Sequence, residues 1–135
     1  MSKLPNQFFY SKEEDRLNVI SHGLGFVLSI IGLIFLLIKG LQDFDLLRFL
    51  SFIIYGISLS TMYIASTLYH NSKTPEGRYK FRLFDMVSIY LLIAGSYTPF
   101  TLTVLIDNGG LTLFYFGVVN SYFWYNLENI YCWKI

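Results

Sequence analysis

The sequence predicts an all-α integral membrane protein with about four transmembrane helices. The first observation is composition, because 54% of the 135 residues are hydrophobic and 19% are aromatic, whereas 14% are charged. The second is a set of four long apolar stretches, each with the roughly 17–25 residues that a helix needs to cross about 30 Å of hydrocarbon. The third is that these stretches do not alternate apolar and polar residues as barrel strands do. Helices are therefore the expected spanning elements.

The chain divides into a polar leader, a transmembrane domain and a tail. We expect the cytoplasmic leader at 1–16, the transmembrane domain at 17–127 and an atypical C-terminal tail at 128–135. The predicted spans are 17–38, 49–70, 84–106 and 111–127. The fourth span is the weakest, because the side-chain amides of Asn120 and Asn126 need hydrogen-bond partners in hydrocarbon.

The individual spans carry features that bear on packing. In the first span, glycines permit close helix approach, a common feature of membrane helices; they are Gly23, Gly25 and Gly32. The second span ends at His70. In the third, Pro99 lacks a backbone N–H, which predicts a kink. Ser96 and Thr98 are placed to satisfy the backbone groups that the proline frees.

Charge is unevenly distributed between the two sides of the predicted helices. Cations gather before the first span and between the second and third spans: Lys3, Lys12, Arg16, Lys73, Arg78, Lys80 and Arg82. The loops of the opposite side are balanced or lack cations. The positive-inside rule therefore places the N-terminus in the cytoplasm. We expect a multi-pass protein with the lipid bilayer, and no nucleic acid, as its partner.

Three polar residues at the cation-rich side form the candidate site. The four-residue spacing of Ser66 and His70 places both on one helix face, and an antiparallel neighbour would bring Asp85 beside them. Ionisable groups at membrane depth are costly and usually serve function. The alternative is that they are boundary residues facing water.

A histidine near a carboxylate also suggests a metal. Neutral imidazole is a strong zinc ligand, and a carboxylate either binds zinc or orients its water. A catalytic zinc site typically has three protein ligands and an open position. His70 and Asp85 would therefore need a further ligand from His22, Glu14 or another subunit.

Several separated motifs resemble the haemolysin III family, over roughly residues 12–117. They are Glu14-x-Arg16-Leu-Asn18-x-x-x-His22-Gly-x-Gly25, Ser66-Thr-Leu-Tyr-His70, Asp85, and the segment Ile89-Tyr-Leu-Leu-Ile-Ala-Gly-Ser-Tyr-Thr-Pro-Phe100. The family is related to progestin and adiponectin receptors and, more distantly, to alkaline ceramidases. Its members have a seven-helix bundle with a cytoplasmic N-terminus, so the four spans here would be part of such a bundle.

The resemblance implies a zinc site in the cytoplasmic half of a multi-pass protein of the bacterial plasma membrane. His70 would be a zinc ligand, Asp85 would hold zinc through a water, and Ser66 would lie beside them. In a hydrolytic reaction on a lipid amide, Asp85 would accept a proton and Ser66 would stabilise the oxyanion. Ser66 and Asp85 are thus the predicted catalytic residues.

The departures from the family pattern leave three functional hypotheses. The last family helix supplies an H-x-x-x-H pair, whereas no histidine follows His70 here, so the ligand set is incomplete and we expect a truncated member. The first hypothesis is a metal-dependent membrane hydrolase or a receptor-like relative, with possible self-association to complete the site. The second is a pore-forming, cytolytic protein, although the spans lack the ring of charges that defines a conduction path. The third is an inactive membrane-inserted fragment.

Overall fold

The computed structural model describes residues 10–42 and 44–132, and within them every regular element is helical. The elements are α1 (Lys12–Gln42), α2 (Leu46–Asn71), α3 (Pro75–Pro99), the π-helical turn η2 (Phe100–Val104) and α4 (Gly110–Cys132). The predicted all-α fold is confirmed. The predicted tail at 128–135 lies partly outside the described residues, and its side chains lie wholly outside them.

Side-chain caps fix where the first three helices begin. Ser11 and Glu14 form a reciprocal capping box at α1, with the Ser11 N–H donating to Glu14 Oε2 at 2.8 Å and the Glu14 N–H donating to Ser11 Oγ at 3.2 Å. Asp45 caps α2 by accepting from the Arg48 N–H. Thr74 caps α3 by accepting from the Gly77 N–H, and Pro75 follows in the first turn, where its missing N–H costs nothing.

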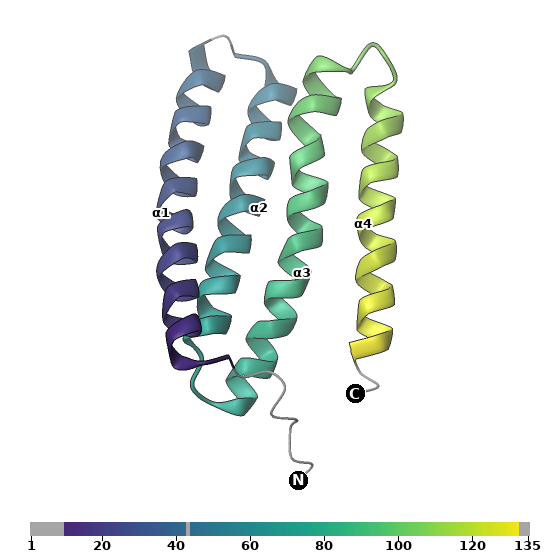
Figure 1. Cartoon of the computed structure of the whole chain (residues 1–135). Coiled ribbons are helices and arrows are strands. Elements are labelled where there is room, and N and C mark those ends of the chain that lie inside the picture. The colour runs from purple at the N-terminus through teal and green to yellow at the C-terminus, as the bar shows by residue number, and fades with distance from the viewer. Residues whose placement is uncertain (1–9, 43, 133–135) are drawn as a thin grey trace.

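The helices form a row in which each packs against its neighbours along the chain (Figure 1). Because consecutive helices are antiparallel, the start of α1, the end of α2 and the start of α3 lie at one end of the row. We call this end the site end. It carries the cation-rich segments on which the orientation was predicted.

Small polar residues, rather than large apolar ones, fill the contacts between helices. Between α1 and α2, Ser29 and Ser60 are buried and their hydroxyls lie 2.9 Å apart. A Cβ on Gly56 would overlap the Leu33 side chain, so the two helices approach closely there. Large apolar side chains instead project outward along the helices, among them Leu28 and Phe35. This arrangement is typical of helices that face lipid.

The α2–α3 contact has the same character and contains the predicted proline. A Cβ on Gly95 would overlap Ser58, whose side chain is buried between the helices. Pro99 cannot donate to the carbonyl of Gly95, and the Thr98 hydroxyl donates to that carbonyl instead, at 2.6 Å. The helix changes to the π-helical turn directly after Pro99. The predicted compensation by Thr98 is present, and the irregularity takes the form of a π-turn.

Three of the described helices are long and apolar enough to cross a membrane, namely those that span Lys12–Gln42, Leu46–Asn71 and Pro75–Val104. They correspond to the first three predicted spans. α4 packs along α3 as a helix but is not among the three. The polar residues Asn120, Ser121 and Asn126 lower its hydropathy, so the predicted fourth span remains a prediction.

Candidate functional site

The candidate site lies at the site end, where three helices contribute polar side chains. α1 supplies residues from its first three turns, α2 supplies its last two turns, and α3 supplies its first three turns. The antiparallel row places these segments side by side (Figure 1). Residues more than 50 positions apart in the sequence therefore contact one another.

His70 is held by the carboxylate of Asp15. The His70 Nδ1 atom lies 3.0 Å from Asp15 Oδ1, and the side chains are 9% and 19% exposed. The Asn18 side-chain amide approaches the same ring nitrogen at 3.5 Å. Asn18 Nδ2 is a donor, but the Asp15 carboxylate is the nearer partner of Nδ1 and favours the tautomer that carries its proton there, which leaves Nε2 as an electron-pair donor. Asp15 thus orients the ring, and among the described residues no hydrogen bond reaches Nε2.

Arg78 completes this cluster from α3. Its guanidinium donates from Nη1 to Asp15 Oδ2 and from Nη2 to Asp15 Oδ1, both at 2.7 Å. The side chain is 4% exposed and lies 5.0 Å from the centre of the Tyr69 ring. A bidentate pair of this kind fixes geometry as well as charge. Asp15 therefore joins the ends of α1, α2 and α3.

Ser66 and Asp85 are further polar residues near His70. Ser66 is buried and lies near the carboxyl of Asp85, and His70 and His22 are also neighbours of that carboxyl. The His22 and His70 rings are parallel within 3° with their centres 6.0 Å apart. The structure thus brings together Ser66, His70 and Asp85, the three residues of the predicted site, and adds His22.

The donor set fits a zinc ion in part. His70 offers Nε2 from a ring held by a carboxylate, an arrangement typical of metal-ligating histidine, and Asp85 offers carboxylate oxygens. Among the described residues, however, no cluster of three or more His, Cys, Asp or Glu side chains could hold a metal. Glu14, considered as a further ligand, is engaged in the helix cap instead. The metal-binding and catalytic roles of Ser66, His70 and Asp85 stay predictions.

Asp15 and Arg78 were not among the predicted site residues. For Asp15 a signal exists, because Asp15, Asn18 and His22 follow one another at spacings of three and four and so share a helix face. For Arg78 the sequence offers only one cation among several in the α2–α3 connection. Its selection by Asp15 depends on how the helices pack.

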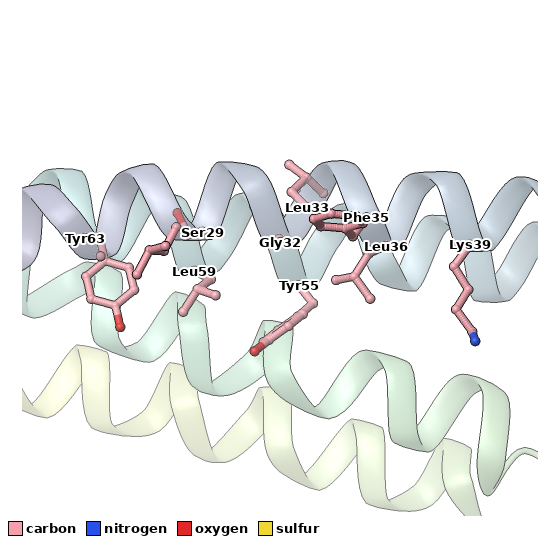
Figure 2. Close-up of a pocket in the computed structure, with 12 residues that line it drawn as sticks. Ser29, Gly32, Leu33, Phe35, Leu36, Lys39, Tyr55, Leu59 and Tyr63 are labelled. Carbon is pink, nitrogen blue, oxygen red and sulfur yellow. The ribbon is translucent and has the colours of Figure 1, made fainter.

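Two pockets lie at different positions along the helices, one at the site end and one further along α1 and α2. One, of about 890 Å³, opens at the site end beside His70 and is lined by charged residues. The other, of about 510 Å³, lies between α1 and α2 and is lined mainly by apolar side chains; Figure 2 shows Tyr63 near one of its ends and Lys39 near the other. Since polar groups do not converge in this second pocket, it is not the candidate site.

Comparison with known proteins gives matches over most of the chain. A sequence profile described as "Haemolysin-III related" matches residues 10–125. A "Hemolysin-3" of Bacillus cereus is 41% identical over 101 residues, which cover 75% of this chain and 46% of that protein. A "Hemolysin-3 homolog" of Bacillus subtilis (strain 168) is 38% identical over 104 residues, which cover 77% of this chain and 49% of that protein. The chain thus spans about half the length of these curated relatives. No solved structure matches it.

Proposed function

Because the chain belongs to the haemolysin III family, we propose that its site end forms part of a zinc-dependent hydrolytic site for a membrane lipid amide. The observation that carries the proposal is the contact of the His70 ring with the Asp15 carboxylate, at a place where Asp85 and Ser66 are also close. Asp15 lies 3.0 Å from Nδ1, and the carboxyl of Asp85 has Ser66 and His70 among its neighbours. The apolar helices around this site make a lipid the natural substrate class.

Each residue has a distinct role in this proposal. His70 would bind zinc through Nε2, and Asp15 would hold the ring in the required orientation. When bound, zinc polarises a carbonyl and makes water acidic enough to attack near neutral pH. Asp85 would accept a proton, and the Ser66 hydroxyl would donate a hydrogen bond to the charge that develops on the substrate oxygen.

The ligand set would need a group in addition to His70 and Asp85. A second copy of the chain is one source, and His22 is another because its ring already lies beside His70. The arrangement at the membrane follows the predicted orientation, with the site on the cytoplasmic side of the plasma membrane.

Zinc content tests this proposal. We would measure zinc in the detergent-purified chain by elemental analysis after dialysis against zinc at low micromolar concentration. We expect between one zinc per two chains and one zinc per chain, lost in His70→Ala and reduced in Asp85→Ala. Ser29→Ala is the matched control, because Ser29 is a buried polar residue far from the site end along α1. A folded wild-type chain without zinc would contradict the metal site and favour the inactive-fragment hypothesis.

Membrane lysis is a second candidate function, favoured by the names of the two relatives. Release of a trapped dye from lipid vesicles would test it separately. If dye is released, the His70→Ala variant shows whether lysis depends on the polar site. Intact vesicles at high protein loading would contradict this function.

A further inference from the structure

We propose that the pocket at the site end binds the phosphate-bearing headgroup of an anionic glycerophospholipid. The pocket lies between the first turns of α1, the last turn of α2 and the α2–α3 connection, and has a volume of about 890 Å³. Four cations and one carboxylate line it: Lys12, Arg16, Lys73, Arg78 and Asp15. The pocket is therefore a positively charged site between membrane helices, a setting in which anionic headgroups bind.

Three of the four cations are available to a ligand. Arg78 is committed to Asp15 through two hydrogen bonds and has little exposed surface. Lys12, Arg16 and Lys73 are exposed. Among the described residues, the ion pairs are Asp15–His70 and Asp15–Arg78, so none of these three cations takes part in one. These three cations are the proposed headgroup ligands, and they do not belong to the proposed zinc site. His70 and Asp15 of the proposed zinc site also line the pocket, but binding of a headgroup by the three cations requires neither zinc nor hydrolysis.

The depth of the pocket matches the headgroup layer of a bilayer. The apolar stretch 17–38 of α1 is about 33 Å long at 1.5 Å per residue, close to the hydrocarbon thickness of about 30 Å. Arg16 comes directly before this stretch, and Lys12 lies one helical turn further out. Both cations thus lie at the level where lipid phosphates are found.

Apolar residues in the same pocket favour a lipid over free phosphate. Val19 and Ile20 line the pocket within the apolar stretch of α1, on the membrane side of Arg16. Tyr10, Asn71 and Ser72 also line it and supply hydrogen-bonding groups. A glycerophospholipid has groups in the same order: its phosphate and glycerol oxygens would meet the cations and hydrogen-bonding groups, and its first acyl carbons would meet Val19 and Ile20.

Native mass spectrometry of the detergent-purified chain tests the proposal. The chain would be titrated with phosphatidylglycerol, with phosphatidylcholine of the same acyl chains, and with inorganic phosphate as a competitor. We expect one phosphatidylglycerol per chain, bound at least tenfold more tightly than phosphatidylcholine and displaced poorly by phosphate. Each of the substitutions Lys12→Gln, Arg16→Gln and Lys73→Gln should weaken binding about fivefold, from the usual contribution of one cation near an anionic surface.

Lys80→Gln is the matched control. Lys80 is an exposed cation near the start of α3 and does not line the pocket. Its substitution removes the same charge and should leave binding unchanged. Circular dichroism would verify that each variant stays helical, which is expected because all four substitutions are at exposed positions.

Three results would overturn the proposal. Equal affinity for the two lipids would mean that the headgroup charge is not recognised. Loss of binding in Lys80→Gln as large as in the pocket variants would indicate attraction by overall charge rather than by this pocket. Displacement of the lipid by phosphate at equal concentration would indicate a site for the free anion.

Discussion

Substitution Asp15→Asn tests the cluster that joins three helix ends. The change keeps the shape of the side chain but removes its charge and one acceptor of the two 2.7 Å hydrogen bonds from Arg78. Arg78 would then keep its charge in a position where its side chain is 4% exposed. Removing one partner of a fully buried ion pair typically costs about 3–5 kcal/mol.

We expect Asp15→Asn to lower the free energy of unfolding by less than the value for a fully buried ion pair. The Asp15 side chain is 19% exposed, so water can partly replace the lost carboxylate. The asparagine also retains one oxygen that can accept from the guanidinium. We therefore expect the free energy of unfolding to fall by about 2 kcal/mol. The assay is urea-driven unfolding in detergent micelles, followed by far-ultraviolet circular dichroism.

A double-mutant cycle separates this pair from general effects of charge. We expect Arg78→Gln to cost about as much as Asp15→Asn, and the double variant to cost at least about 1 kcal/mol less than the sum. Glu14→Gln is the control, since Glu14 is exposed and takes part in the helix cap alone. Additive costs, or an Asp15→Asn variant as stable as the control, would refute the reasoning.

The remaining predictions concern packing and the π-turn. Gly95→Leu should separate α2 from α3 and lower the free energy of unfolding by about 2 kcal/mol or more, because a Cβ there already overlaps Ser58. Gly23→Leu is the control and should be tolerated, because open space surrounds Gly23. The same unfolding assay compares the two variants, and equal losses of stability would contradict the observed contact. Thr98→Val should cost about 1–2 kcal/mol by leaving the Gly95 carbonyl without its hydroxyl partner. Adding Pro99→Ala should recover part of this loss, since alanine restores the backbone donor, and no recovery would show that the hydroxyl does not replace the missing bond.

The positions of the helices could be predicted from the sequence, but the side-chain contacts between helices could not. Apolar stretches determine where helices form, and Pro99 marks where the third becomes irregular. Ser66 and His70 share a face by helical spacing alone, and the antiparallel hairpin brings Asp85 to them. Arg78 could not be distinguished from neighbouring cations, because its pairing with Asp15 depends on side-chain packing between α1 and α3.

Which helix faces meet in the row could not be predicted from the sequence either. A hydropathy pattern indicates which segments enter a bilayer but not which faces meet. Buried small residues recur at seven-residue intervals, as Ser51, Ser58 and Ala65 do in α2, and this spacing indicates the packed face of a helix but not the helix that it meets. Close approach between specific pairs follows from the packed arrangement.

The central claim is that Asp15 holds Nδ1 of His70 and leaves Nε2 to bind zinc. Nitrogen-15 NMR of the two histidines tests this claim most directly. With two histidines in the chain, His22→Gln assigns the signals. We predict that His70 carries its proton on Nδ1, and that added zinc shifts the Nε2 resonance while Nδ1 stays protonated. A proton on Nε2 in the zinc-free chain, or a His70 spectrum that zinc leaves unchanged, would contradict the account.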